Sequence, residues 1–291
     1  MTDLTDTEEI LEGPPPLEAG EIIAPGYEVI VHLHRSNNFD VYDAWSEERA
    51  SRCIAKTPIP DCLDDRELMR GLIREGRLLK KLTHPHIVRA YETIREPRPA
   101  LILETLSGAT LSYLIDTSPQ RLPLKDIAHL GLHLCSAVRY LHRHGILHLD
   151  LKPSNIVSEC QRAKILDLSI ARPPGRGRKH AGTRNYMAPE QARGDYLSPA
   201  TDVWGIGAVL FEAATGELPF DAPDDEDRYE QLERRAEPVR SYRRVPAAFN
   251  GLVGSCLEPE PARRPTLGEL TEALRELVVQ EPGRRNRSET D

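Results

Sequence analysis

The segment His148–Val157, "HLDLKPSNIV", constrains this chain more than any other part of it. It places Asp150, Lys152 and Asn155 in one short loop. Such a set is typical of phosphoryl transfer: a carboxylate orients a hydroxyl and accepts its proton, an amide oxygen binds Mg²⁺, and a cation lies near the moving phosphoryl group. Asp167 follows a short apolar strand a little further on and supplies a second carboxylate suited to the metal. We therefore take Asp150 and Lys152 as candidate catalytic residues, and Asn155 and Asp167 as candidate metal ligands.

The pattern of apolar residues divides the chain at about residue 105. Before it, alternating and β-branched runs predict strands over 27–33, 40–45, 52–59, 84–96 and 100–106, with one amphipathic helix over 65–82. After Gly108, helical spacing predicts helices over 126–145, 200–216, 226–236, 247–257 and 267–278. The chain is thus expected to be an α+β protein with a strand-rich first lobe and a mostly helical second lobe.

Composition narrows the classes of function. The formal net charge of −8 gives no support to nucleic-acid binding. No run of about 18 apolar residues indicates a membrane span, and the acidic N-terminus is unlike a signal peptide. The five cysteines are scattered and form no paired motif, which favours a reducing, cytoplasmic location. Residues 1–24, acidic and with a "GPPP" run, are predicted to be a flexible tail, and 281–291 a second tail.

Several further motifs, in order, resemble those of eukaryotic-type serine/threonine protein kinases, in the style of the bacterial and actinobacterial members. The resemblance covers about residues 27–280. The catalytic-loop motif H-R-D-x-K-x-x-N appears as 148–155, the D-F-G motif as 167–169, the A-P-E motif as 188–190, and the lysine strand V-A-I-K as 53–56. The resemblance implies the bilobal protein-kinase fold, with an antiparallel sheet and helix C in an N-lobe of about 25–104 and a mostly helical C-lobe of about 107–280.

The resemblance also implies roles for particular residues. Lys56 would position the α- and β-phosphates of ATP and would pair with Glu75 of the helix. Thr183 would contact the catalytic Asp150, and Arg264 would pair with Glu190. The positions that match the nucleotide-binding residues of the family are Leu33, Val41, Ala55, Lys56, Leu103, Glu104, Leu106, Val157 and Asp167. The implied cofactors are ATP and Mg²⁺, with Mn²⁺ as an alternative metal.

The chain departs from the family pattern in its first loop. Where the family has L-G-x-G-x-F-G-x-V-Y, this chain has Leu33 to Tyr42 without a glycine. Glycine serves there because it reaches positive φ and lets backbone N–H groups approach phosphate closely. Asparagine reaches the left-handed region better than most residues, so Asn37 and Asn38 are predicted to make the turn and Phe39 to cover the phosphates. Some loss of ATP affinity is expected, while the metal ligands are retained.

The chain also departs from the family at Leu149, where many kinases have an arginine that binds a phosphorylated activation loop. Between Ser169 and Pro189 the further hydroxyl-bearing residues are Thr183 and Tyr186, both in the "GTRNYMAPE" motif. We therefore predict that activity does not require phosphorylation in the activation loop.

The sequence leaves more than one function open. The first hypothesis is a serine/threonine protein kinase whose partners are protein substrates, itself included, and which forms no contact with nucleic acid. A homodimer is left open. The second is a pseudokinase that binds nucleotide and acts as a scaffold, which the altered loop favours and the retained Lys56, Asp150, Asn155 and Asp167 oppose. The third is a small-molecule phosphotransferase, which the "APE", "DVWGIG" and "PARRPT" motifs oppose.

Overall fold

The computed structural model describes residues 13–96, 98–222, 225 and 227–280. The chain divides into two compact units, one made of residues up to Thr83 together with Arg89–Thr105, the other of His84–Val88 together with the residues from Leu106 onward. This division is close to the predicted one, with a single exchange. His84–Val88, predicted as part of the first lobe, belongs to the second unit because Val88 N donates to Ile165 O and Ile165 N donates to His86 O.

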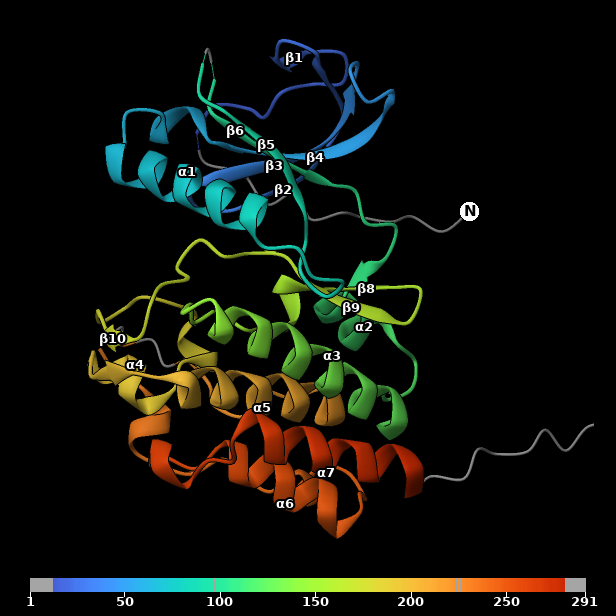
Figure 1. Cartoon of the computed structure of the whole chain (residues 1–291), viewed down its shortest axis with the longest axis vertical. Coiled ribbons are helices and arrows are strands. Elements are labelled where there is room, and N and C mark those ends of the chain that lie inside the picture. The colour runs from blue at the N-terminus through green and yellow to red at the C-terminus, as the bar shows by residue number, and fades with distance from the viewer. Residues whose placement is uncertain (1–12, 97, 223–224, 226, 281–291) are drawn as a thin grey trace, which may run out of the picture. The chain divides into compact units, whose positions relative to one another are not determined.

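The first unit is built on a six-stranded antiparallel sheet with the order β1-β2-β3-β4-β6-β5 (Figure 1). Its strands are β1 (Ile22–Ala24), β2 (Tyr27–Arg35), β3 (Phe39–Ser46), β4 (Ser51–Pro58), β5 (Ala90–Ile94) and β6 (Ala100–Glu104). Because side chains alternate along a strand, one face of the sheet carries a buried cluster that includes Tyr42, Ala44, Cys53, Ala55 and Ile102. The opposite face therefore carries Val41, Ile54 and Lys56.

Helix α1 (Arg66–Lys81) is the long helix of the first unit. Asp65 begins it, since its carboxylate accepts hydrogen bonds from the backbone N–H groups of Glu67 and Leu68. Leu72 and Leu79 are buried at helical spacing, as predicted from the sequence, and Glu75 lies between them on the same buried side. The helix thus carries a carboxylate into the interior of this unit.

The N-terminal segment differs from its prediction as a flexible tail. Ile22–Ala24 forms strand β1, Ile23 and Ala24 are buried, and Leu17 packs against the same core cluster. The Leu17 N–H donates to the Tyr42 hydroxyl at 2.9 Å, and Arg35 donates to the Pro14 carbonyl. The acidic and proline-rich composition concealed these few apolar anchors. Residues 1–12 of the predicted tail, and 281–291 at the other end, lie outside the described residues.

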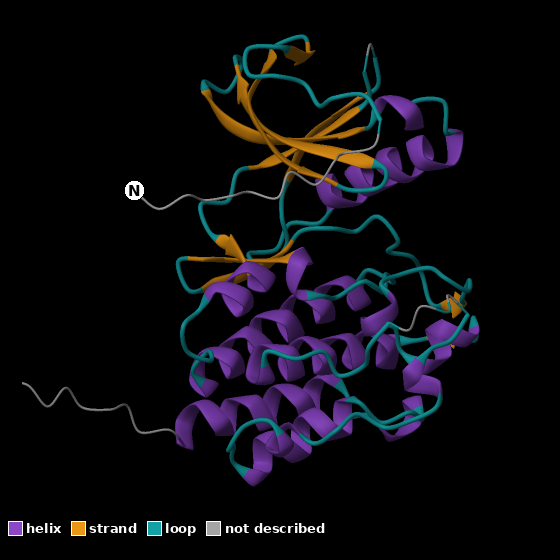
Figure 2. Ribbon diagram, turned by 180° about the vertical axis from the view of Figure 1, so that it is seen from behind, coloured by secondary structure: helices purple, strands orange, loops and turns teal. Residues whose placement is uncertain are grey.

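The second unit is mostly helical, as predicted (Figure 2). Its helices are α2 (Leu111–Thr117), α3 (Leu124–Arg143), α4 (Pro189–Arg193), α5 (Pro199–Thr215), α6 (Ala247–Cys256) and α7 (Leu267–Gln280). Its short strands are β7 (Ala109–Thr110), β8 (Ile156–Glu159), β9 (Arg162–Ile165), β10 (Gly175–Arg176) and β11 (Tyr196–Leu197). Helix α5 is buried along almost its whole length and contacts α3 and α6. It ends at Gly216, whose left-handed backbone caps the helix.

One predicted helix of the second unit is wrong. Within 226–236 the described residues form only a 3₁₀ turn at Glu230–Leu232. The charged and aromatic residues there have helical spacing, but contacts with other segments hold the turn: Gln231 Nε2 donates to the carbonyls of Arg184 and Met187, and Tyr229 is buried. Among the residues that the structure describes, no helix is both long and apolar enough to cross a membrane.

Candidate active site

A buried carboxylate of α5, that of Asp202, holds the loop that carries Asp150. Asp202 accepts hydrogen bonds from the backbone N–H groups of His148 and Leu149, both at 2.9 Å, and His142 Nε2 lies 2.7 Å from it. His148 is fully buried, which lowers its pKa, and its Nδ1 accepts from the Asp150 N–H at 3.2 Å. The loop is therefore fixed at two successive backbone positions just before Asp150.

Three side chains meet at the Asp150 carboxylate. Its Oδ1 accepts from the hydroxyl of Thr183 at 2.8 Å and from the Thr183 N–H at 3.0 Å. Its Oδ2 accepts from Asn155 Nδ2 at 3.0 Å and lies 3.2 Å from Lys152 Nζ. Lys152 Nζ also donates to the Thr183 hydroxyl at 2.7 Å. The structure thus brings together three candidate catalytic residues, Asp150, Lys152 and Thr183, with the candidate metal ligand Asn155, and fixes the orientation of the carboxylate.

The oxygens of Asn155 and Asp167 suit a magnesium ion. Asn155 uses its amide nitrogen twice, for the carbonyl and the carboxylate of Asp150, which turns the amide oxygen the other way. Asp167 follows β9, and its Oδ1 accepts from the Ser169 N–H at 2.7 Å. The described residues hold no cluster of three or more His, Cys, Asp or Glu side chains for a metal. Two protein oxygens completed by water and phosphate oxygens are nevertheless a usual magnesium environment.

Lys56 and Glu75 form the predicted pair inside the first unit. Lys56 Nζ lies 3.0 Å from Glu75 Oε2, and the side chain of Glu75 is 1% exposed. The ring of Phe39 covers the same ammonium, with its centroid 4.9 Å from Lys56 Nζ. Phe39 stands where the family has the third glycine of the loop, so in this chain an aromatic ring lies against the cation that would bind phosphate.

The loop without glycine is closed differently from its prediction. Neither Asn37 nor Asn38 has a positive φ, so the expected left-handed turn is wrong. Instead the Ser36 N–H donates to the Phe39 carbonyl, and the Phe39 N–H donates to the Ser36 hydroxyl. Asp40, which is buried, accepts two hydrogen bonds from Arg35 at 2.8 Å. A side-chain cap and a bidentate ion pair thus replace the conformational freedom of glycine.

The register of the sheet corrects one predicted nucleotide contact. Ala55 is fully buried in the core cluster on the face opposite Lys56. Ile54 instead shares the face of Lys56, and it pairs directly with Leu103 of β6, while Val41 pairs with Lys56 itself. The motif V-A-I-K aligns as Cys53-Ile54-Ala55-Lys56, so Ile54 occupies the position of the family alanine. The residue expected to contact the nucleotide is therefore Ile54, not the predicted Ala55.

The remaining predicted nucleotide-binding residues lie as follows. Leu33 is 53% exposed on β2, and Leu103 is buried in β6. The side chain of Glu104 accepts a hydrogen bond from the Arg89 N–H. Any contact of Glu104 with the nucleotide is therefore expected from its backbone. In the second unit, Leu106 is half-buried and Val157 is buried in β8.

Leu149 occupies the position of the missing arginine. Its φ of 70° lies in the left-handed region, which costs a non-glycine residue about 1–2 kcal/mol. Its side chain is buried in a cluster with Leu147 and Leu197, and Ile170 packs against the cluster. Gln191 Nε2 donates to the Leu149 carbonyl at 2.9 Å. Apolar packing thus connects the catalytic loop to the segment that follows Asp167.

Two more buried pairs fix the region after Thr183. Arg264 donates to both oxygens of Glu190, at 2.7 and 2.8 Å, as predicted. The Tyr186 hydroxyl donates to Glu212 Oε2 at 2.6 Å, a contact the sequence analysis missed. Burial raises the pKa of Glu212 to about 7 and also raises the pKa of Tyr186. The available signal was a single acid in the apolar run "AVLFEAAT" of α5.

Comparison with known proteins identifies the family. The family described as "Protein kinase domain" matches residues 34–276. This chain belongs to the protein kinase family, and its α+β fold is the protein-kinase fold.

Individual relatives agree with this assignment. The serine/threonine-protein kinase PknB of Mycolicibacterium smegmatis is 32% identical over 263 residues, which is 85% of this chain and 40% of the relative. The DNA damage-responsive serine/threonine-protein kinase RqkA of Deinococcus radiodurans is 30% identical over 267 residues, 87% of this chain and 39% of the relative. A variant of the PknI kinase domain of Mycobacterium tuberculosis shares the fold with a TM-score of 0.73, at 23% identity, and the match covers 90% of this chain and 99% of that domain. The chain spans about 40% of the length of the curated bacterial relatives it matches.

Proposed function

We propose that this chain is a serine/threonine protein kinase that transfers the γ-phosphoryl group of ATP to hydroxyl groups of proteins. The observation that carries the proposal is the hydrogen-bonded set of Asp150, Thr183, Lys152 and Asn155. Such a set orients a hydroxyl and balances charge on the phosphoryl group, which is most of what phosphoryl transfer asks of a protein.

The proposed reaction proceeds at Asp150. The substrate hydroxyl forms a bond to the γ-phosphorus while the bond from that phosphorus to the bridging oxygen of ATP breaks, and ADP leaves. Asp150 accepts the hydroxyl proton, and Lys152 stabilises the charge on the transferred group. Lys56, held by Glu75, binds the α- and β-phosphates. Asn155 and Asp167 would hold Mg²⁺, which neutralises phosphate charge when bound; Mn²⁺ would fit the same oxygens.

We assign the kinase domain to residues 25–280, with the described part of the N-terminal segment packed onto it. In the first unit, the face for adenine is formed in our proposal by Leu33, Val41, Ile54 and Leu103, with the backbone of Glu104. In the second unit, Leu106 and Val157 match nucleotide-binding positions of the family. Protein substrates and a cytoplasmic location belong to the same proposal. Lys152 and Thr183, which both contact the Asp150 carboxylate, match residues typical of the serine/threonine branch of the family, and this resemblance favours serine and threonine hydroxyls as acceptors.

We also propose that activity does not require a phosphate in the activation segment. In kinases that need one, an arginine beside the catalytic aspartate binds it. Here Leu149 fills that position and packs with Leu147, Leu197 and Ile170. Apolar burial of this kind stabilises a conformation without any added charge.

A second candidate function is that of a nucleotide-binding pseudokinase that acts as a scaffold. The observation that favours it is the Phe39 ring over Lys56, because the ring covers part of the ammonium that phosphate would use. The network at Asp150 opposes it, since a scaffold has no need of an oriented proton acceptor.

Two measurements separate these functions. Thermal unfolding with and without Mg·ATP, with Asp167→Ala as a control, reports nucleotide binding. Transfer of labelled phosphate to a generic protein such as casein, followed by phosphoamino-acid analysis, reports activity. A kinase gives both stabilisation and labelled serine or threonine; stabilisation without label supports the scaffold, and labelled tyrosine alone contradicts the serine/threonine assignment.

A further inference from the structure

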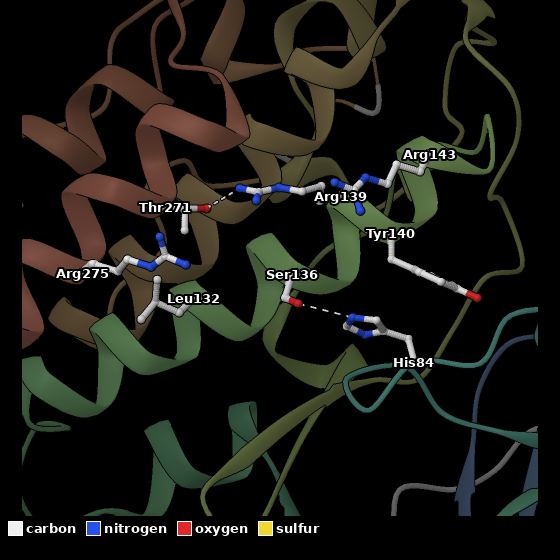
Figure 3. Close-up of a pocket in the computed structure, with 8 residues that line it drawn as sticks. All are labelled: His84, Leu132, Ser136, Arg139, Tyr140, Arg143, Thr271 and Arg275. Atoms are coloured by element: carbon white, nitrogen blue, oxygen red, sulfur yellow. Dashed lines mark hydrogen bonds between the residues drawn. The ribbon is translucent and has the colours of Figure 1, made fainter.

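A cavity of about 450 Å³ lies in the second unit, and neither Asp150 nor the residues that contact its carboxylate are among its lining residues. Helix α3 contributes Arg139, Tyr140 and Arg143, helix α7 contributes Thr271 and Arg275, and His84 comes from the segment that precedes β5. Figure 3 shows the three arginines along one side of this cavity and His84 along the opposite side. The described residues that line it include no carboxylate.

Among the residues that the structure describes, two of these arginines form no ion pair with an acid. Arg139 Nη2 donates to the Leu267 carbonyl at 2.9 Å and to the Thr271 hydroxyl at 2.7 Å, and both acceptors are neutral. The guanidinium is thereby fixed in place before any ligand arrives. Arg143 is exposed, and within the described part of the chain it forms no ion pair. Arg275 pairs with Glu272 at 2.8 Å, but both side chains are largely exposed, and such a pair is weak.

The opposite side of the cavity offers neutral hydrogen-bond donors. His84 Nδ1 accepts from the His86 N–H at 3.2 Å, so the ring hydrogen lies on Nε2, which faces the Ser136 hydroxyl at 3.3 Å. Burial lowers the pKa of His84, with His86 adding to the effect, which keeps the ring neutral near pH 7. The lining thus combines fixed positive charge with hydroxyl and N–H groups, the usual partners of phosphate oxygens.

We propose that this cavity binds the phosphate group of a phosphoserine or phosphothreonine side chain in another polypeptide. Guanidinium groups match phosphate oxygens in pairs, and a group fixed in advance loses little entropy on binding. The choice of a protein-borne phosphate rests on the proposed function, because a serine/threonine kinase makes such groups. The net charge of −8 on the whole chain gives no support to a general nucleic-acid or membrane binder, which favours a single phosphate group on a polypeptide as the ligand.

The test is a binding titration without ATP. A short Ala/Gly-based peptide with one central phosphothreonine, labelled with a fluorophore, is titrated with the full chain, with its Asp150→Asn variant, and with Arg143→Ala and Arg275→Ala. Arg244→Ala is the matched control, since Arg244 is an exposed arginine outside the cavity. The unphosphorylated peptide, inorganic phosphate as competitor, and vesicles of anionic lipid complete the set.

The proposal predicts binding of the phosphopeptide by both the full chain and Asp150→Asn, with inorganic phosphate competing. Arg143→Ala and Arg275→Ala should each raise Kd about tenfold, and Arg244→Ala should leave it within about twofold. Because Asp150→Asn removes the proposed proton acceptor, retained binding separates this site from the catalytic proposal. Equal affinity for the unphosphorylated peptide, equal loss in all three arginine variants, or stronger binding to vesicles than to the phosphopeptide would overturn the proposal.

Discussion

The aromatic ring of Phe39 lies over the ammonium of Lys56, with its centroid 4.9 Å from Nζ, while Glu75 Oε2 lies 3.0 Å from the same nitrogen. In the resembling family the position of Phe39 is a glycine, whose backbone approaches phosphate directly. Here the cation that would bind phosphate is already in contact with a carboxylate and a ring. A phosphate group of the nucleotide must therefore share the Lys56 ammonium with the Phe39 ring or displace the ring.

Replacing Phe39 by glycine is expected to tighten ATP binding. A cation–π contact contributes about 0.5–2 kcal/mol depending on its exposure, so removal of the ring should lower the Kd for Mg·ATP by about two- to thirtyfold. Isothermal titration calorimetry measures this directly. Phe39→Leu is the matched control, because it removes the π-system but keeps apolar bulk, and it should give a smaller gain. Weaker binding by Phe39→Gly would show that the ring is instead part of the nucleotide-binding surface.

The apolar cluster around Leu149 should be a main source of stability for the catalytic loop. Leu149→Ala removes a buried side chain without changing the cost of its left-handed backbone, and should lower the free energy of unfolding by about 2–5 kcal/mol. Leu232→Ala, at a side chain that is 36% exposed, should cost about 1 kcal/mol or less. Chemical denaturation followed by fluorescence compares the two. Equal costs would show that the cluster does not stabilise the loop.

The ion pair of Arg264 and Glu190 is buried and bidentate. Arg264→Ala leaves the Glu190 carboxylate buried without its partner and should lower the free energy of unfolding by about 3–5 kcal/mol. Arg228→Ala breaks an exposed pair with Glu233, whose charges are screened by solvent, and should leave the free energy of unfolding almost unchanged. A loss at Arg264 as small as that at Arg228 would contradict the assigned role of the buried pair.

Glu212 should make stability depend on pH. Burial raises its pKa from 4.5 to about 7, so folding takes up a proton between these values. The contribution of this group to stability therefore falls as pH rises from about 4.5 to about 7, by at most about 3 kcal/mol in total. Above about pH 7 this contribution no longer changes. Glu212→Gln keeps an acceptor for the Tyr186 hydroxyl and removes the titration. The thermal midpoint of the variant should thus exceed that of the wild type at pH 8 and match it near pH 5; an equal difference at both values would reject this cause.

The sequence was informative where local chemistry decides the structure. The leucines of α1, the glycine that ends α5 and the motifs around Asp150 and Glu190 gave the right elements and the right pairs. Each of these features depends on residues close together in the sequence, and their spacing alone indicates the structure.

The rest depended on long-range packing or on side-chain contacts that no motif indicates. Leu17 and Ile23 anchor a segment that its composition predicted to be disordered. A few apolar residues are enough to order such a segment when they pack against a core cluster. The turn at Ser36 depends on a side-chain cap and on the ion pair of Arg35 and Asp40, not on a left-handed asparagine. Because side chains alternate along β4, Ile54 and not Ala55 shares a face of the sheet with Lys56.

The initial rate of phosphate transfer from γ-labelled ATP to casein tests most directly whether this protein is a kinase that is active without phosphate on its activation segment. The protein is first treated with a phosphatase, the phosphatase is removed, and mass spectrometry verifies that no phosphate remains. We predict that the wild type transfers phosphate without a lag and that Asp150→Asn is slower by a factor of about 10²–10⁴. No transfer by the wild type, a lag that ends only when Thr183 acquires phosphate, or an equal rate in Asp150→Asn would contradict this prediction.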